Sequence, residues 1–138
     1  MSAVLLNAPM QAPAQHAPGV WPSPRECSNI SPNELRRCIG RRVDAKQRTL
    51  GQLYPRALAA VQSRFAKWGR NDTRLKPRYF VNAHREWRQF VDSNCTAVGA
   101  FGGGSSSSIS DRISQCRERA IDERIQFYRQ LADGTYGI

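Results

Sequence analysis

The clearest feature of the chain is a regular spacing of apolar residues between positions 35 and 68. They recur every three, four or seven positions, which places them on one side of an α-helix. The stripe comprises Leu35, Ile39, Val43, Leu50, Tyr54, Leu58, Val61, Phe65 and Trp68. Pro55 interrupts it. Because an interior proline lacks a backbone donor and collides with the preceding turn, we expect a kink or break near Leu53 and Tyr54.

The residues around this stripe indicate where the first helix begins and ends. Ser31 and Glu34 have the spacing of a capping box, in which each side chain accepts a hydrogen bond from the other residue's backbone N–H. Pro32 suits the first helical position, where its missing N–H has no helical partner. We expect the helix to end at Gly69 and a basic loop to cover residues 70–76.

Two more helices follow from the same periodicity. The second is expected from about residue 78 to residue 98. Its apolar face carries Phe80, His84, Trp87, Val91, Cys95 and Val98, with Phe90 beside it. A flexible connector of glycine and serine is predicted over 102–108. The third helix is expected from near Ser108, with Asp111 completing a cap, to Gly134. Its face carries Ile109, Ile113, Cys116, Ala120, Ile121, Ile125 and Tyr128.

The pattern therefore predicts an all-α fold, a three-helix bundle with a long, proline-kinked first helix. Residues 1–24 have no periodicity and are rich in alanine, proline and glutamine, which favours a flexible lead-in or a signal remnant. Residues 25–138 are expected to form a single helical domain. The residues expected to serve as structural core also include Tyr54, Trp87, Phe90 and Arg124.

The chain has four cysteines, at positions 27, 38, 95 and 116. An even number fits two disulfides in any of three pairings and favours an oxidising compartment. Four reduced core cysteines in a cytosolic protein are the alternative. A zinc site is disfavoured, because there is no CxxC pair and His16 lies far from His84 in sequence.

Export would require a leader, and the apolar segment 2–6 is too short to be one. Ala12-Pro13-Ala14 resembles a cleavage site, so we expect a periplasmic or secreted protein whose signal peptide is missing or trimmed in this sequence. No apolar run approaches the roughly 20 residues needed to span a bilayer.

The net charge of +10 is concentrated in one part of the chain. Residues 31–78 hold thirteen basic and three acidic residues, whereas the flanking regions are each neutral. Eighteen of the 21 basic residues are arginine, which suits acidic partners, although a compositional bias toward arginine is the alternative. The candidate partner-binding residues are Arg37, Arg41, Arg42, Arg48, Lys67, Arg70, Arg74 and Lys76.

No set of residues predicts catalysis, a metal or a cofactor. His84 is expected to be a hydrogen-bonded core histidine. Glu118, Asp122 and Glu123 alternate with arginines, which indicates ion pairs along one helix face. The serines after Gly104 lack a GxSxG context, and the glycines before them fit no phosphate-binding loop.

Three sequence blocks resemble the LprI-type lysozyme-inhibitor domain, a family of small four-cysteine helical proteins of the bacterial envelope. The first is Cys27 followed by Ser31-Pro32-x-Glu34 and Cys38. The second is Trp87-x-x-Phe90-x-Asp92-x-x-Cys95, and the third is Cys116 followed by Glu123-Arg124-Ile125. Leu50-x-x-x-Tyr54 also fits, and the likeness covers residues 26–132. Val91, His84 and Gln47 depart from the usual family residues.

The resemblance implies pairing of Cys27 with Cys38 and of Cys95 with Cys116. It also implies inhibition of lysozyme-like muramidases by binding to a protein partner. Because two basic surfaces repel each other, we expect an acidic or neutral muramidase as the target, and an immunity protein against a secreted toxin fits this description. The competing hypothesis is an envelope protein that binds polyanions such as anionic lipid or lipopolysaccharide, with nucleic acid disfavoured outside the cytosol. The oligomeric state is left open.

Overall fold

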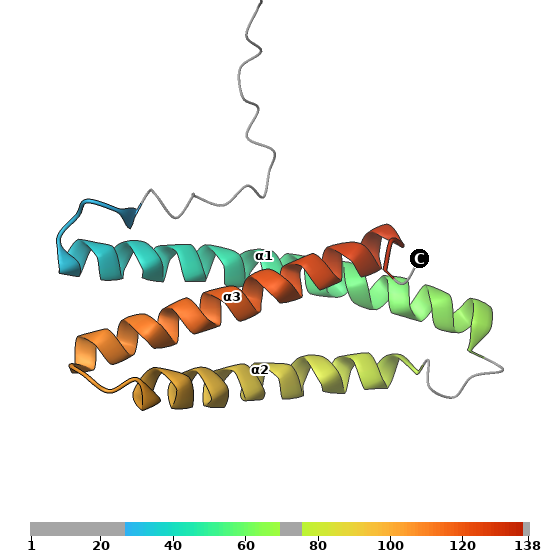
Figure 1. Ribbon diagram of the computed structural model, residues 1–138. Helices are drawn as coiled ribbons and strands as arrows, with labels where there is room; N and C mark the ends of the chain where they lie inside the picture. The colour runs from blue at the N-terminus through green and yellow to red at the C-terminus, as the bar shows by residue number, and fades with distance from the viewer. Residues whose placement is uncertain (1–26, 70–75, 137–138) are drawn as a thin grey trace, which may run out of the picture.

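The computed structural model describes residues 27–69 and 76–136, and this part of the chain consists of three α-helices and no strand. They are α1 (Pro32–Trp68), α2 (Pro77–Phe101) and α3 (Ser106–Asp133) (Figure 1). The all-α, three-helix prediction is confirmed. The helix ends lie within three residues of the predicted positions, which is the usual uncertainty where helices fray.

The predicted start of α1 is confirmed by its hydrogen bonds. The Ser31 hydroxyl accepts a hydrogen bond from the Glu34 backbone N–H at 3.3 Å, and the Glu34 carboxylate accepts one from the Ser31 N–H at 3.0 Å. Because these bonds satisfy backbone donors that would otherwise lack partners, they define one starting point for the helix.

Pro55 does not break α1, so that alternative of the prediction is wrong. The helix runs through the proline, and its C-terminal part slopes away from the line of its N-terminal part (Figure 1). Pro55 lies on the exposed side, while Leu53 and Ala57 on either side of it are buried. Water can therefore satisfy the carbonyl freed by the proline, and the buried neighbours hold the helix in place.

Helix α3 is the central element, because α1 and α2 each pack mainly against it and touch each other much less (Figure 1). The buried positions of α1 alternate in steps of four and three, as in helices that pack along their whole length. They are Ile39, Val43, Lys46, Leu50, Leu53 and Ala57. Helix α3 contributes Ile121, Ile125, Leu131 and Tyr128, whose side chain is fully buried. We call this interface the α1–α3 seam.

The expected core residues Tyr54 and Trp87 are half-buried and pack against this core. The Arg124 guanidinium lies 4.5 Å from the centre of the Trp87 ring and also faces Phe127 and Tyr128. Arginine stacked on aromatic rings in this way covers the edge of the core while keeping its charge near water.

Phe90 is not a core residue, which corrects the prediction for that position. Its side chain is 64% exposed, and Val98 and Trp68 from the predicted stripes are also exposed. The buried side of α2 consists of Val91, Cys95 and Gly99. Phe90 lies about 100° from Val91 around the helix, so it points away from α3.

Both disulfides implied by the family resemblance are present. Cys27 pairs with Cys38, with 5.8 Å between Cα atoms, and Cys95 pairs with Cys116, with 5.4 Å between Cα atoms. The first joins the segment before α1 to that helix, and the second joins α2 to α3. No helix in the described ranges is long and apolar enough to cross a membrane.

We predict that replacing Cys95 and Cys116 together by alanine lowers the free energy of unfolding by about 3 kcal/mol, because the 21-residue loop they close gains freedom in the unfolded chain. Urea unfolding of the oxidised proteins measures this loss. Adding a reductant should then destabilise the variant much less than the wild type. Equal stability of variant and wild type would contradict the prediction.

Candidate functional site

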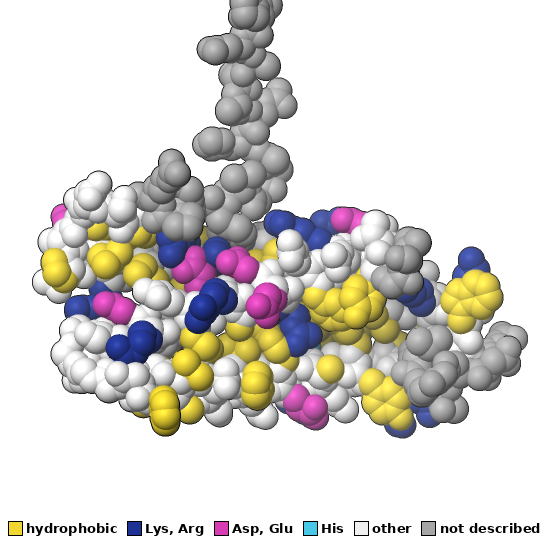
Figure 2. Space-filling model, in the orientation of Figure 1, with side chains coloured by type: hydrophobic (Ala, Val, Ile, Leu, Met, Phe, Trp, Pro, Cys, Tyr) yellow, Lys and Arg dark blue, Asp and Glu magenta, His cyan; other side chains and the backbone are white. Residues whose placement is uncertain are grey.

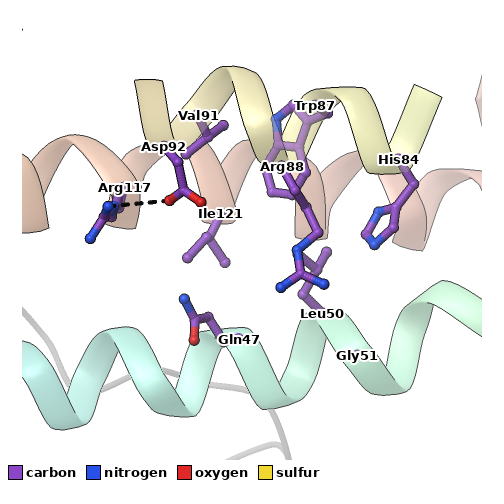
Figure 3. A pocket seen from close by; sticks show the side chains of 10 residues that line it. All are labelled: Gln47, Leu50, Gly51, His84, Trp87, Arg88, Val91, Asp92, Arg117 and Ile121. Atoms are coloured by element: carbon purple, nitrogen blue, oxygen red, sulfur yellow. Dashed lines mark ion pairs between the residues drawn. The ribbon is translucent and has the colours of Figure 1, made fainter. Parts of the chain in front are cut away.

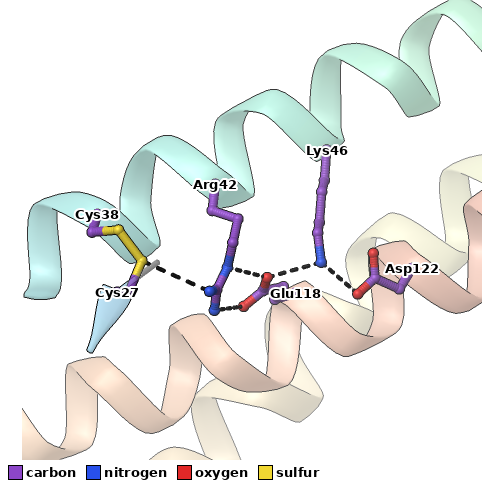
Figure 4. A network of polar contacts seen from close by, with 6 residues as sticks. All are labelled: Cys27, Cys38, Arg42, Lys46, Glu118 and Asp122. Carbon is purple, nitrogen blue, oxygen red and sulfur yellow. Dashed lines mark hydrogen bonds and ion pairs between the residues drawn. A yellow bond between two sulfur atoms is a disulfide. The ribbon is translucent and has the colours of Figure 1, made fainter. Parts of the chain in front are cut away.

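A cluster of charged side chains interrupts the apolar α1–α3 seam (Figure 4). The carboxylate of Glu118 on α3 lies 2.5 Å from Nε of Arg42, accepts a hydrogen bond from its Nη2 at 2.7 Å, and lies 2.8 Å from Nζ of Lys46. Lys46 also reaches Asp122 at 2.5 Å. Lys46 and Glu118 are 5% and 8% exposed, so these charges are removed from water almost as fully as the core.

Burial opposes ionisation of Glu118, but the hydrogen bonds and positive charges of Arg42 and Lys46 outweigh it and hold the pKa of Glu118 below its ordinary value of 4.5. The carboxylate is therefore ionised at neutral pH. Two anions, Glu118 and Asp122, and two cations, Arg42 and Lys46, form a structural ion-pair network. It lacks the free base or acid that general acid–base catalysis requires.

This network corrects two predictions about charged residues. Glu118 and Asp122 pair with α1 across the interface, whereas ion pairs along α3 were expected. Arg42 was a candidate partner-binding residue, but its side chain is only 11% exposed and is engaged with Glu118 and near the Cys27 sulfur. The sequence carries a faint sign of this arrangement, because the seven-residue gap between Val43 and Leu50 leaves a seam position that Lys46 fills.

Three other candidates, Arg37, Arg41 and Arg48, are exposed on α1. At about 100° per residue they lie on the side of the helix opposite the α1–α3 seam. We call these three residues the arginine face. Asp44 is the single acidic residue between the first and last of them.

The remaining candidates do not join the arginine face. Lys67 is exposed near the other end of α1, about 39 Å from Arg41 along the helix axis at 1.5 Å per residue. Lys76 is half-buried at the start of α2. Arg70 and Arg74 lie outside the described residues. The stretch of basic residues in the sequence is therefore divided between the two ends of the molecule.

A pocket of about 180 Å³ opens between α1 and α2, with α3 behind it (Figure 3). Gln47, Leu50 and Gly51 line it from α1, and Ile121 and Arg117 from α3. Helix α2 forms the opposite wall of the pocket and contributes His84, Trp87, Arg88, Val91 and Asp92. Because Asp92 pairs with Arg117 at 3.2 Å, Arg88 is the one charged group lining this pocket that forms no ion pair with another described residue, and the pocket suits a small polar or acidic group.

His84 lines the pocket and forms a hydrogen bond with a core residue. Its Nδ1 lies 2.6 Å from the Tyr128 hydroxyl, which agrees with the prediction of a hydrogen-bonded histidine. Burial, with the charges of Arg88 and Arg124, lowers the pKa of His84, and burial raises the pKa of Tyr128 to about 12. Both groups are neutral at pH 7, and the described residues contain no cluster of three metal-ligating side chains.

The turn between α2 and α3 is tightly built, in contrast to the flexible connector that was predicted. The Arg112 side chain donates hydrogen bonds to the Gly99 carbonyl at 2.9 and 3.0 Å and another to the Gly103 carbonyl. Gly103 and Gly104 take positive φ angles of 62° and 94°, which glycine adopts without strain. Ser105 caps α3 by accepting a hydrogen bond from the Ser108 N–H.

Gly99 allows the two helices to approach closely at this turn. A Cβ atom at that position would overlap Cγ1 of Ile113 and lie 3.2 Å from the carbonyl oxygen of Ile109, so a larger residue would require α3 or the Ile113 side chain to shift. The last side chain of α2, Phe101, is 95% exposed. The end of this helical hairpin therefore combines a fixed backbone with a large, uncovered aromatic ring, which lies on neither of the apolar faces predicted for these helices.

The fold and these surfaces define a disulfide-bonded α-helical binding protein, with its charges used for packing on one side of α1 and presented to solvent on the other. The chain belongs to the LprI lysozyme inhibitor family, whose sequence model matches residues 26–127. It matches no curated protein and no solved structure. Membership in this family implies that the protein partner is a lysozyme. The family is typically extracytoplasmic.

We predict that Glu118→Ala lowers the free energy of unfolding by about 3 kcal/mol, because Arg42 and Lys46 would keep buried charges with no shared anion. Chemical denaturation at pH 7 measures the change. Glu123→Ala is the matched control, because Glu123 is an exposed acidic residue on the same helix. This substitution should lower the free energy of unfolding by less than about 0.5 kcal/mol. Similar losses in the two variants would show that the network is unimportant.

The same carboxylate should make stability depend on pH. Because the pKa of Glu118 is lowered on folding, its contribution is fully present above the unfolded value near 4.5 and is lost as pH falls through the lower folded value. The stability difference between wild type and Glu118→Gln should therefore be largest at pH 7 and should shrink toward pH 3. A difference that is independent of pH in urea unfolding would refute this assignment.

Proposed function

We propose that this chain inhibits an acidic or neutral lysozyme-like muramidase outside the cytoplasm, as an immunity protein that protects the cell wall from a secreted enzyme. The observation that carries the proposal is the arginine face on a member of a lysozyme-inhibitor family. Three exposed guanidinium groups on one side of a rigid helix form a surface that attracts carboxylate-rich proteins.

The distribution of charge between the helices supports this choice of target. Helix α1 contains nine basic and two acidic residues, whereas α3 contains five of each. Arg36, Arg42 and Lys46 are committed to acidic residues of α3, as the mixed charges along that helix in Figure 2 illustrate. Among the other six basic residues of α1, Arg37, Arg41 and Arg48 lie opposite the α1–α3 seam and make that side of the helix positive.

A positive surface affects which muramidase can approach. Encounter with an acidic enzyme is accelerated by long-range attraction, and encounter with a strongly basic lysozyme is slowed by repulsion. Both effects weaken as salt is added, because the screening length falls from about 30 Å at 0.01 M to about 8 Å at 0.15 M ionic strength.

The two disulfides support the part of the proposal that places the protein outside the cytoplasm. Such bonds persist in the periplasm and outside the cell but are rare in the cytosol. Intact mass of material isolated from its native compartment, with and without reduction and thiol labelling, tests this directly. Four free thiols would count against export.

The function is tested by measuring hydrolysis of peptidoglycan by a panel of acidic, neutral and basic muramidases in the presence of the oxidised protein. Stoichiometric inhibition of an acidic or neutral enzyme is the expected result. Inhibition confined to basic enzymes would overturn the target assignment. Absence of inhibition, together with salt-labile binding to lipopolysaccharide or anionic vesicles, would favour a polyanion-binding protein instead.

We predict that reversing the charge of Arg37, Arg41 and Arg48 together weakens inhibition of an acidic muramidase by at least tenfold at low salt. The physical reason is the loss of electrostatic steering, so the association rate measured by surface binding should fall more than the dissociation rate changes. The effect should diminish at high salt.

A variant with Arg56, Arg64 and Arg85 changed to glutamate is the matched control, because it alters net charge equally at exposed positions outside the arginine face. It should retain most of the inhibition. If both triple variants lose inhibition to the same extent, net charge alone matters and the arginine face is not the contact surface. Thermal unfolding verifies that both variants remain folded.

A further inference from the structure

We propose that the end of the α2–α3 hairpin, residues 99–108, is the part of the molecule that enters the polysaccharide-binding cleft of the inhibited muramidase. We call these residues the hairpin tip. The inference rests on the proposed function and names the contact element that blocks the enzyme.

The first observation is the chemistry of the hairpin tip. In a chain in which 23% of residues are charged, the 18 residues from 93 to 110 contain no charged residue, and Asp92 and Asp111 border them. The hairpin tip offers one aromatic ring, four consecutive serines and glycine backbone. Apart from the ring, these are hydroxyl and amide groups, which can hydrogen-bond as the hydroxyls and amides of a glycan chain do.

A muramidase cleft matches this chemistry. Glycoside hydrolases act through a pair of carboxyl groups that flank the glycosidic bond, and the rest of the cleft recognises uncharged sugar rings. Hydroxyl and backbone N–H groups can donate to those carboxylates without bringing a charge into the cleft. An uncharged tip also avoids the desolvation cost that a buried arginine would incur.

The second observation is the exposure of Phe101. At 95% exposed, its ring contributes almost nothing to the folded core. Aromatic residues are enriched in protein–protein interfaces, where a few side chains carry most of the affinity. Figure 2 shows hydrophobic side chains protruding along α2, on the side away from the mixed charges of α3.

The third observation is that the hairpin tip is held in one shape. The Cys95–Cys116 disulfide joins the two helices shortly before the turn, and Arg112 binds carbonyl groups on both sides of Gly102. The Ser105 hydroxyl lies within 3.0 Å of the hydroxyls of Ser107 and Ser108. A preorganised element loses little entropy when it is inserted, so more of its contact energy appears as affinity.

The fourth observation is that the hairpin tip lies at the end of the bundle where the arginine face begins. The turn between α2 and α3 lies at the same end of the bundle as the start of α1 (Figure 1), and Arg36 near that start lies 3.6 Å from Asp111. An acidic enzyme drawn toward Arg37 and Arg41 would therefore meet the uncharged tip at the same end. The arginines supply attraction and the hairpin tip supplies the occlusion.

The test uses a muramidase that the full-length oxidised protein inhibits and compares Phe101→Ala with Trp68→Ala. Trp68 is also an exposed aromatic residue, at 61%, but lies at the C-terminal end of α1. We expect Phe101→Ala to raise the inhibition constant at least tenfold with unchanged thermal unfolding, and Trp68→Ala to change it less than twofold. Equal inhibition by wild type and Phe101→Ala would overturn the inference while leaving the proposed function intact.

A second pair of variants tests the requirement for an uncharged surface. Ser106 is exposed in the first turn of α3, where glutamate and glutamine are both compatible with a helix start. Ser106→Glu should weaken inhibition at least tenfold more than Ser106→Gln, because its carboxylate would face those of the enzyme. Equal constants for the two variants would place the hairpin tip outside the cleft.

The mode of inhibition, competitive or noncompetitive, distinguishes a contact in the cleft from other roles of Phe101. Inhibition by the wild type should be competitive with a soluble N-acetylglucosamine oligosaccharide that occupies the cleft. Noncompetitive inhibition, or Phe101-dependent binding to anionic vesicles without any change in the inhibition constant, would overturn the inference. A wild-type protein that inhibits no muramidase in the panel would defeat the proposed function itself.

Discussion

The interaction that most restricts the position of α1 along α3 is that of the Glu118 carboxylate, which lies between Arg42 and Lys46 in a largely apolar interface. Apolar contacts that repeat along two helices allow several registers of similar energy, because one hydrophobic layer can replace another. A buried anion cannot slide in this way, since any other register would leave its charge and those of its partners unpaired. The chosen register brings the start of α1 beside the α2–α3 turn, where Arg36 approaches Asp111.

Covalent and polar ties hold the remaining parts to this pair of helices. Because α1 and α2 touch each other little, the position of α2 depends on its contacts with α3, including the Cys95–Cys116 bond and the close approach at Gly99. The Cys27–Cys38 bond does the same for the segment before α1. Such cross-links add to the stability supplied by the core, because they reduce the entropy of the unfolded chain.

Charge has two separate uses in this inhibitor-family protein. On the inner side of α1, basic residues are neutralised by α3 and determine packing. On the outer side, Arg37, Arg41 and Arg48 remain exposed and give the molecule a long-range field. The hairpin tip has no charge and presents Phe101 instead. In the complex that we propose, this separation would reconcile a net charge of +10 with binding to a glycan-recognising cleft, because attraction and occlusion would depend on different residues.

The sequence alone determined the number and approximate limits of the helices, the cap at Ser31 and the four cysteines, because each depends on neighbours within a few residues or on a count. The family blocks added the disulfide pairing. Only the tertiary structure decided that Arg42 and Lys46 turn inward to Glu118, that Phe90 lies outside the core and that the glycine-serine segment is a fixed turn. Helical periodicity states which residues share a face, but the choice of faces to be covered depends on contacts between segments about 76 residues apart, as for Arg42 and Glu118.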